Sequence, residues 1–328
     1  MLQTRFTELF GVSHPIVQGG MRGIAMAELT AAVANAGCLG FLSAHTHIEA
    51  ESLRSEIVRA RSLTNRPFGV NLTVLPNIAG RDYDAFARVI LEMEVPFVET
   101  AGSNPAKFIA LFKERGIKVI HKCPSSIRFA LKAQELGADA VSIHGFECGG
   151  HPGEDDLPGL VLIPAAASSL RIPMLSSGGV SDGRGLAAVL ALGADGAVLG
   201  TRFMLTQESP LHPAVKQRML AATVRDTAVI GRSVRDSSRV LRNKLVEEVL
   251  RIEREGQQDY HGLFPMIGAE RWLDASARGD ADDGAFPAGL TIGLIDDLPT
   301  VQDLVERVVD EAVQIITRRL AGFCRQSA

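Results

Sequence analysis

Short runs of β-branched and other apolar residues alternate along the chain with longer segments in which apolar residues recur at helical spacing. This alternation is typical of consecutive strand and helix units around a parallel sheet. The expected strands begin near Pro15, Cys38, Pro67, Pro96, Ile117, Ala138, Pro173 and Asp195. The expected helices include 27–36, 49–61, 83–93, 125–136 and 183–192. Eight such units predict an α/β fold, a (β/α)₈ TIM barrel.

Glycines support the barrel over its main rival. Gly37, Gly116, Gly137 and Gly193 each end a helical segment directly before a strand, and this recurring helix stop is a weak internal repeat. An open doubly wound sheet that binds a dinucleotide would show G-x-G-x-x-G after its first strand. The chain has Gln18-Gly19-Gly20-Met21 there instead.

The pattern changes after the eighth strand. We expect a smaller, mostly helical inserted domain over residues 212–289 that covers the active site, and a barrel built from residues 1–211 plus 290–328. The amphipathic run 300–320 is expected to pack back on the barrel. Arg235, Arg239 and Arg242 have the spacing of one helical face. Because glutamates follow closely, we interpret this face as solvated or salt-bridged, with phosphate binding as the alternative.

Composition narrows the class of protein. The 328 residues carry a net charge of -4, so no overall charge favours nucleic acid or an anionic membrane surface. The N-terminus lacks the apolar stretch of a signal peptide, and no apolar run is long enough to span a membrane. We expect a cytoplasmic protein. Its four scattered cysteines form no C-x-x-C pair, which predicts reduced thiols and no structural zinc site.

Two glycine-rich loops predict a phosphate site. Ser177, Gly178 and Gly179 follow the seventh strand, and Gly200 and Thr201 follow the eighth. These are the loops that commonly bind phosphate in such barrels, and glycine lets backbone N–H groups approach an anion closely. We therefore expect phosphate here, with ordinary turns as the alternative.

Other strand ends suit a flat, polar ring. Gly20 and Met21 close the first strand, Asn71 and Thr73 lie on the third with neutral donors and acceptors, and Lys122 ends the fifth. A lysine beside an isoalloxazine would favour its reduced, anionic form. Alternatively, Lys122 is the partner of a carboxylate such as Glu99.

The loop after the sixth strand, 144–156, carries the densest chemistry. We interpret His151 as a general base or hydrogen-bond donor to substrate, with a loop-fixing histidine as the alternative. A zinc site is rejected because a further ligand is missing. Cys148 could instead be the nucleophile of a barrel without flavin that attacks a purine nucleotide.

These motifs together resemble the nitronate monooxygenase family, formerly called 2-nitropropane dioxygenases. The resemblance rests on Gln18-Gly19-Gly20-Met21, Asn71, His121-Lys122-Cys123, Gly149-Gly150-His151-Pro152-Gly153, Ser177-Gly178-Gly179 and Gly200-Thr201-Arg202-Phe203. It implies non-covalent FMN with its phosphate held by Gly178, Gly179, Gly200 and Thr201, and His151 as the catalytic histidine. The residues implied around the ring are Gly20, Met21, Asn71, Thr73, Lys122 and Gly150. The counterpart of residues 288–290 closes over the flavin.

The family divides in activity. Some members oxidise alkyl nitronates with O₂ through a flavin semiquinone, others resemble NADH:quinone reductases, and others reduce enoyl thioesters. The loop 145–156 resembles the quinone-reductase branch, which places nicotinamide nucleotide near Ser43, Ala44, His45 and Pro76; His45 and His144 depart from its pattern.

We predict an FMN-dependent oxidoreductase that oxidises nitronates with O₂. The alternative is an NAD(P)H:quinone reductase, with NADH or NADPH as reductant; an enoyl-thioester reductase and a purine-nucleotide enzyme without flavin are the further alternatives. The expected partners are these small molecules, without nucleic acid or membrane, and a homodimer is left open.

Overall fold

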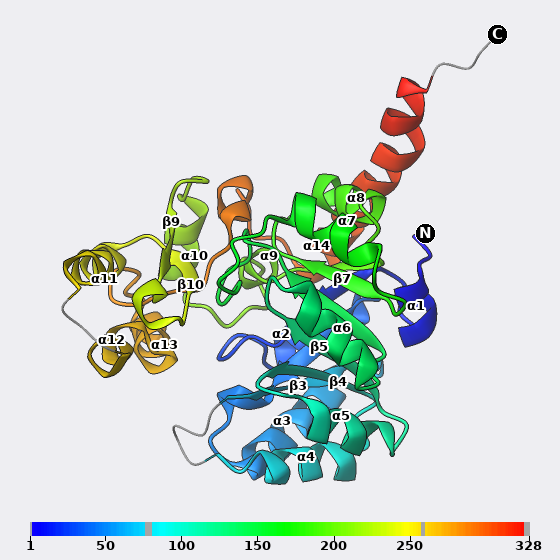
Figure 1. Cartoon of the computed structure of the whole chain (residues 1–328), viewed down its shortest axis with the longest axis horizontal. Helices are drawn as coiled ribbons and strands as arrows, with labels where there is room; N and C mark the ends of the chain where they lie inside the picture. Colours follow the sequence, from blue (N-terminus) through cyan, green and yellow to red (C-terminus); the bar gives the residue numbers. More distant parts are fainter. Residues whose placement is uncertain (1, 76–80, 257–259, 325–328) are drawn as a thin grey trace.

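Eight parallel strands close into a barrel in the computed structural model, which describes residues 2–75, 81–256 and 260–324 (Figure 1). The strands are β1 (Ile16–Gln18), β2 (Leu39–Ser43), β3 (Gly69–Val74), β4 (Phe97–Gly102), β5 (Lys118–Cys123), β6 (Ala140–His144), β7 (Met174–Ser177) and β8 (Gly196–Val198). Val17 pairs with Leu39 on one side and with Val198 on the other, so β1 joins β2 to β8. The predicted (β/α)₈ barrel is confirmed.

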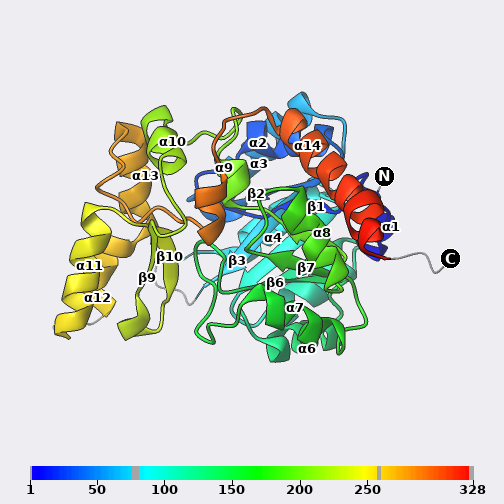
Figure 2. The ribbon, with the colours of Figure 1, turned by 90° about the horizontal axis from the view of Figure 1, so that it is seen from above.

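Helices surround the barrel as the periodicity predicts (Figure 2). They are α2 (Ala27–Asn35), α3 (Ala50–Leu63), α4 (Tyr83–Glu92), α5 (Ala106–Lys113), α6 (Ile127–Glu135), α7 (Gly159–Ala167) and α8 (Gly183–Ala191). Gly37, Gly116, Gly137 and Gly193 have positive φ between each helix and the next strand, which glycine adopts without steric cost. The predicted helix stops are therefore real.

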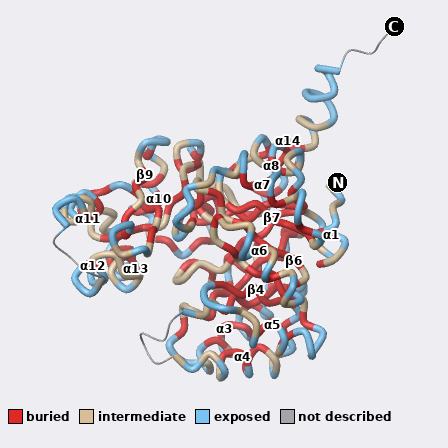
Figure 3. The backbone as a smooth tube through the Cα atoms, in the orientation of Figure 1, coloured by how far each residue is buried: buried red, intermediate tan, exposed pale blue. Residues whose placement is uncertain are grey.

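The barrel interior is apolar and closed at its amino-terminal end. The short helix α1 (Arg5–Phe10) places Phe6 and Phe10 against Phe97, and the rings of Phe10 and Phe97 lie 5.5 Å apart. The buried tube in Figure 3 follows the strands, while solvent reaches the outer faces of the helices. We therefore look for a site at the opposite end of the barrel, where the strands finish.

The chain returns to the barrel at its end. Helix α14 (Val301–Gln314) packs on α8 and α2 through Val301, Leu304, Val305 and Val308, as its amphipathic pattern predicts. The short helical turns η4 (Ile315–Leu320) and η5 (Ala321–Phe323) continue outward into solvent (Figure 1). None of the described helices is long and apolar enough to cross a bilayer.

The elements from α10 to α13 form a separate group beside the barrel (Figure 2). They are α10 (Pro213–Leu220), β9 (Thr227–Ile230), η2 (Arg232–Val234), β10 (Ser238–Leu241), α11 (Lys244–Glu255), α12 (Tyr260–Ile267) and α13 (Ala269–Arg278). Most of the group is helical, but β9 and β10 form an antiparallel hairpin with its own small core, including Ile230, Val240 and Val249.

The helical face expected for Arg235, Arg239 and Arg242 is wrong. Arg235 ends η2 with φ +56°, Arg239 lies in β10 opposite Val229, and Arg242 follows the strand. The residues before and after the turn alternate in a strand, and Gly231 makes the tight turn possible: a Cβ there would lie 2.3 Å from the carbonyl oxygen of Asp236. Strand pairing therefore overrides a spacing that also fits a helix.

Candidate active site

The carboxyl ends of the strands bring several of the predicted residues together around one buried carboxylate. The strand register places Asn71 of β3 beside Glu99 of β4. Glu99 is fully buried and accepts hydrogen bonds from the Gly20 backbone N–H (2.9 Å) and the Asn71 amide (2.6 Å). The Lys122 ammonium lies 3.3 Å from the same carboxylate oxygen. The structure therefore shows the arrangement that was the alternative for Lys122, in which its ammonium group is the partner of the Glu99 carboxylate.

Glu99 keeps one oxygen without a partner. Its Oε1 is buried and unpaired, and a Cβ at Gly19 would lie 3.0 Å from it. Lys122 also donates to the Gly20 carbonyl (3.3 Å), and Thr73 donates to the Asn71 side-chain oxygen (2.9 Å). An unpaired buried carboxylate oxygen is costly, so a donor from a bound molecule would be favoured here. The sequence analysis had named Glu99 only as a partner for Lys122.

Three glycines face open space at the neighbouring strand ends. A Cβ at Gly179 (φ +78°) would come no closer than 3.9 Å to another atom, and one at Gly150 (φ +74°) would have nothing within 4 Å. At Gly200 only the Met21 sulfur would lie within that distance, at 3.8 Å. A Cβ at Gly178 (φ +91°) would instead lie only 2.7 Å from the Cys148 backbone nitrogen. These backbones leave room for a ligand that a side chain would fill.

The segment 288–290 lies against this glycine-rich region. The Gly289 N–H donates to the Thr201 hydroxyl (2.9 Å), and the Leu290 N–H donates to the Glu147 carbonyl (3.0 Å). A Cβ at Gly149 would meet the Gly289 nitrogen at 2.7 Å. The Thr201 hydroxyl therefore has a protein donor, and Gly149 allows the two segments to pack tightly.

The loop that carries His151 is held by the β9–β10 hairpin. Gly150 and Arg239 exchange backbone hydrogen bonds of 3.0 and 2.7 Å. The His151 Nε2 lies 3.4 Å from an oxygen of Asp236, and the His151 side chain is 69% exposed. The expected catalytic histidine thus stands at the solvent edge of the site, with a partner from the insertion that sequence analysis did not identify.

Arg239 is the second residue that sequence reasoning misjudged. Only 4% exposed, it stacks on the Phe146 ring at 4.3 Å and donates from Nε to the Phe146 carbonyl (3.0 Å). It also donates to the Thr227 hydroxyl (3.2 Å), while its Nη2 is buried without a partner. Arg239 is therefore a buried link between hairpin and loop and not part of a solvated face.

His144 lies under the same loop. Its Nδ1 is 3.1 Å from the His151 carbonyl oxygen. Burial, with the charge of Lys122 as a further cause, lowers the pKa of His144 to about 3. The imidazole is therefore neutral at physiological pH and donates to the carbonyl. It shapes the loop and carries no charge into the site.

Cys148 is buried beside Ser177, with Sγ 3.5 Å from the serine oxygen. Burial raises the pKa of the Cys148 thiol, although the hydrogen bond from Ser177 opposes this shift. A thiol that resists ionisation is a poor nucleophile. The geometry therefore argues against the alternative in which Cys148 attacks a purine ring.

A cationic corner formed by Arg22, His45 and Arg81 lies at the ends of the first three strands. His45 Nδ1 is 3.0 Å from an Arg81 nitrogen, and Arg22 pairs with Glu270 of α13 at 2.6 Å. Burial first, then the charges of Arg81 and Arg22, lowers the pKa of His45 to about 4. Glu270 offsets part of the charge of the two guanidinium groups around the neutral histidine, and the positive charge that remains favours an anion. Neither arginine was singled out by sequence analysis.

The other residues expected near nicotinamide are less informative. Ser43 and Ala44 are buried at the end of β2, with exposed fractions of 1% and 2%. Ser43 pairs with Asn71 in the sheet, which places its backbone next to the residue that donates to Glu99. Pro76 lies outside the described residues.

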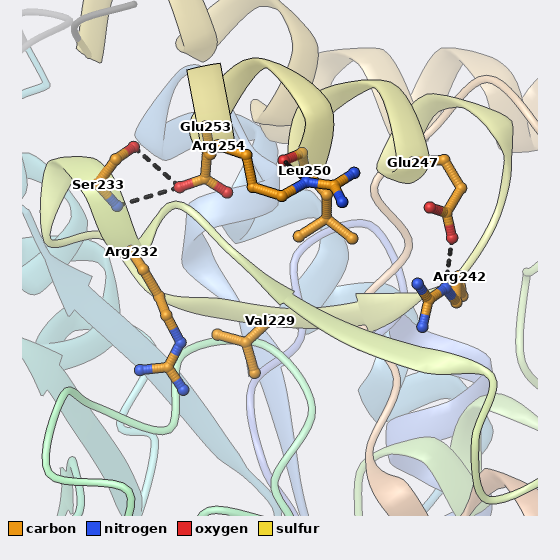
Figure 4. Close-up of a pocket in the computed structure, with 8 residues that line it drawn as sticks. All are labelled: Val229, Arg232, Ser233, Arg242, Glu247, Leu250, Glu253 and Arg254. Carbon is orange, nitrogen blue, oxygen red and sulfur yellow. Dashed lines mark hydrogen bonds and ion pairs between the residues drawn. The ribbon is translucent and has the colours of Figure 1, made fainter. Parts of the chain in front are cut away.

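Two surface hollows accompany these residues. The smaller, about 350 Å³, adjoins the glycine-rich region and is lined by Glu147, Gly179, Val224, Leu290, Thr291 and Leu294. The larger, about 470 Å³, lies between the hairpin and α11 (Figure 4). Its Arg242 pairs with Glu247, and its Glu253 accepts from Ser233. Because the larger hollow lies in the hairpin and α11, away from the barrel strand ends, we place the chemistry at the barrel mouth.

Comparison with known proteins gives one family. The nitronate monooxygenase family matches residues 3–88 and 75–311. FabK from Thermotoga maritima superposes with a TM-score of 0.91 at 35% identity, covering 99% of this chain and 100% of that chain. A nitroalkane oxidase from Streptomyces ansochromogenes superposes with a TM-score of 0.81 at 29% identity, covering 96% and 99%.

A curated relative of Rhodococcus jostii (strain RHA1) is 33% identical over 96% of this chain and 97% of its own length. It is named (3aS,4S,5R,7aS)-5-hydroxy-7a-methyl-1-oxo-octahydro-1H-indene-4-carboxyl-CoA dehydrogenase. The family match spans most of the chain. The Rhodococcus dehydrogenase and the Streptomyces nitroalkane oxidase each align over nearly their full length. The chain is therefore an oxidoreductase of the nitronate monooxygenase family.

Proposed function

We propose that the chain is an FMN-dependent oxidoreductase that oxidises a carbon acid, a substrate with an acidic C–H next to an electron-withdrawing group. The residues at the barrel mouth fit FMN. Gly150, Gly179 and Gly200 face space that no described side chain fills, which suits a phosphate and a planar ring. The unpaired Glu99 oxygen suits a ring N–H donor.

FMN, when bound, supplies a two-electron acceptor. The chain's own part is to hold and orient. Gly178, Gly179, Gly200 and Thr201 would hold the phosphate, and Gly20, Asn71, Thr73 and Lys122 would surround the ring. The Lys122 cation, 3.3 Å from Glu99, balances the buried carboxylate and would stabilise negative charge that accumulates on the ring.

His151 is the observation that carries the substrate class. Its imidazole projects from the loop that follows Gly150 and is open to solvent, so a substrate can reach it. A nitroalkane bears a C–H whose removal gives the nitronate, and a histidine is suited to accept that proton near neutral pH. We infer that the enzyme oxidises nitronates with O₂ as electron acceptor. By removing the C–H proton, His151 would also allow the neutral nitroalkane to be used as a substrate.

The test is anaerobic mixing of the yellow holoenzyme with one donor at a time. Ethyl nitronate should bleach the flavin absorbance rapidly in both the native enzyme and the His151→Ala variant. Neutral nitroethane should bleach it rapidly only in the native enzyme, with a loss on the order of 10²-fold in the variant. Rapid bleaching by NADH or NADPH, followed by reoxidation with a quinone and no response to nitronate, would establish the quinone-reductase alternative instead.

The cationic corner favours a second candidate, a CoA thioester substrate. A thioester also acidifies its α C–H, so His151 could serve the same proton removal. Arg22, His45 and Arg81 lie at the same barrel end and offer cations to a phosphate-bearing group, which a simple nitronate lacks. The 33% identical relative is named for a CoA thioester. Bleaching by an acyl-CoA in the same assay, without response to nitronate, would select this candidate.

A further inference from the structure

The β9–β10 hairpin docks on the loop 150–156 at successive positions. Gly150 exchanges backbone hydrogen bonds with Arg239. The Glu154 carboxylate accepts from the Ser237 N–H (3.0 Å) and hydroxyl (2.6 Å). Farther along, Asp156 pairs with Arg232 at 2.8 Å. These contacts fix the register between the loop and the hairpin independently of the contact between His151 and Asp236.

The position of Asp236 is set by its backbone. Its N–H donates to the Gly231 carbonyl (3.0 Å), closing the turn between the two strands. Gly231 permits this closure because any Cβ would clash with the Asp236 carbonyl oxygen at 2.3 Å. The closed turn fixes the Asp236 backbone, so only its side-chain rotamer remains to be ordered when the carboxylate meets His151.

Asp236 is charged when it meets His151. The hydrogen bond from His151 lowers the pKa of the Asp236 carboxyl, and this effect outweighs the opposing desolvation. Two other carboxylates of this region have partners of their own: Glu154 accepts from Ser237, and Asp156 pairs with Arg232. On the barrel side His144 is neutral at physiological pH, and its Nδ1 meets the backbone carbonyl of His151.

We propose that Asp236, contributed by the insertion, is a positioning residue that holds His151 with Nε2–H toward its carboxylate and leaves Nδ1 free to accept the substrate proton. The inference rests on the proposed function. In the step, the α C–H bond breaks, its electron pair stays on the substrate carbon, and the proton moves to Nδ1. The imidazolium that forms is stabilised by the Asp236 carboxylate. The insertion thereby completes the catalytic site.

The experiment compares Asp236→Asn with Asp156→Asn in the holoenzyme. Asp156 is a matched control because it lies on the same loop as His151 and also pairs with a residue of the hairpin, Arg232. This ion pair is exposed to a similar extent as the one between His151 and Asp236 but does not involve His151. Nitrogen NMR of ¹⁵N-histidine protein, with His151→Gln to assign the signal, reports which ring nitrogen carries the proton. We expect mainly the Nε2–H form in native enzyme and in Asp156→Asn, and a mixture of both forms in Asp236→Asn.

Stopped-flow flavin reduction gives the second readout. Asp236→Asn should slow reduction by neutral nitroethane by roughly tenfold, since the pair is partly exposed, and leave reduction by ethyl nitronate unchanged. A merely structural role would change both substrates together and would leave the tautomer in place. Unchanged tautomer populations, or an equal change in Asp156→Asn, would overturn the proposal. If the tautomer shifts but no carbon acid reduces the flavin, the pairing stands and the proposed function fails.

Discussion

At the residue scale, the Glu99 carboxylate sets the character of the barrel mouth. It is fully buried, and its charge is balanced by Lys122, whose side chain is only 18% exposed. Breaking a buried pair from one side leaves an uncompensated charge, whereas removing both charges costs far less. The two residues should therefore be tested together.

We predict that Lys122→Met lowers the free energy of unfolding by about 3 kcal/mol, because the buried Glu99 carboxylate loses its cation. The double variant Lys122→Met with Glu99→Gln should recover most of this loss. Urea unfolding followed by circular dichroism measures both. Equal destabilisation in the single and double variants would show that packing of the lysine stem, and not charge, is what matters.

The proposed phosphate site at Gly179 can be tested with a matched control, because Gly116 has the same backbone conformation as Gly179 and lies outside the site. Gly179 and Gly116 have φ of +78° and +71°, and an added Cβ meets nothing within 3.9 Å at the first and nothing within 4 Å at the second. Alanine at either position should cost about 1 kcal/mol of stability from its left-handed backbone. Only Gly179→Ala should weaken FMN retention, measured by fluorescence of flavin released on dialysis. Equal retention by both variants would place the phosphate elsewhere.

At the element scale, the parts that the sequence predicts well are those in which local signals agree. Each strand of the barrel has an apolar run, and glycine stops precede several of them, so periodicity and turn chemistry give the same answer. In the hairpin they conflict. The spacing of Arg235, Arg239 and Arg242 fits a helix, while the alternation around Gly231 fits strands. The pairing of β10 with β9 resolves the conflict in favour of strands, and the burial of Arg239 against Phe146 depends on a tertiary contact that the helical spacing does not show.

The cationic corner is also an arrangement between elements, since Arg22 follows β1, His45 follows β2 and Arg81 precedes α4. If a CoA thioester is the substrate, Arg22→Gln and Arg81→Gln should each weaken its binding to the holoenzyme by roughly tenfold, about 1.4 kcal/mol, with stronger effects at low salt. Arg242→Gln is the control, because Arg242 is paired with Glu247 much as Arg22 is with Glu270, but follows the hairpin strand β10 and is not part of the cationic corner. Calorimetry with CoA and with CoA lacking its 3′-phosphate separates the phosphates involved; equal affinities in all variants would remove the corner from substrate binding.

At the scale of the whole molecule, the site is assembled from positions that are far apart in the chain. Gly20, Asn71 and Lys122 were identified as separate strand ends, and the barrel fold itself implied that they would meet. Glu99, between them, carries no motif and became central only through its buried contacts. Asp236 is farther still from recognition, because its role depends on how the insertion docks. Sequence therefore indicates the barrel side of the site better than the insertion side.

The last prediction concerns acid stability, which the barrel's buried histidines govern. His121, 5% exposed, lies in β5 with Nδ1 2.9 Å from the Thr100 hydroxyl. Burial lowers its pKa from 6.5 to about 4. The unfolded chain therefore binds a proton below pH 6.5 that the folded barrel refuses until about pH 4. The contribution of His121 to the free energy of unfolding is fully present above pH 6.5, the pKa in the unfolded chain. It is lost as the pH falls from 6.5 to about 4, by roughly 3 kcal/mol at most.

Replacing His121 by Gln keeps a polar group beside Thr100 but removes the titration. Urea midpoints measured between pH 7 and pH 4, followed by circular dichroism of the barrel helices, should fall less steeply in the variant than in the native chain, whatever its stability at neutral pH. The comparison of slopes is what decides, because packing changes shift the whole curve by a constant amount while proton linkage changes its inclination. Parallel curves would mean that His121 takes up its proton without cost in the folded barrel, and that another group, such as His45 or His144, governs the acid limit.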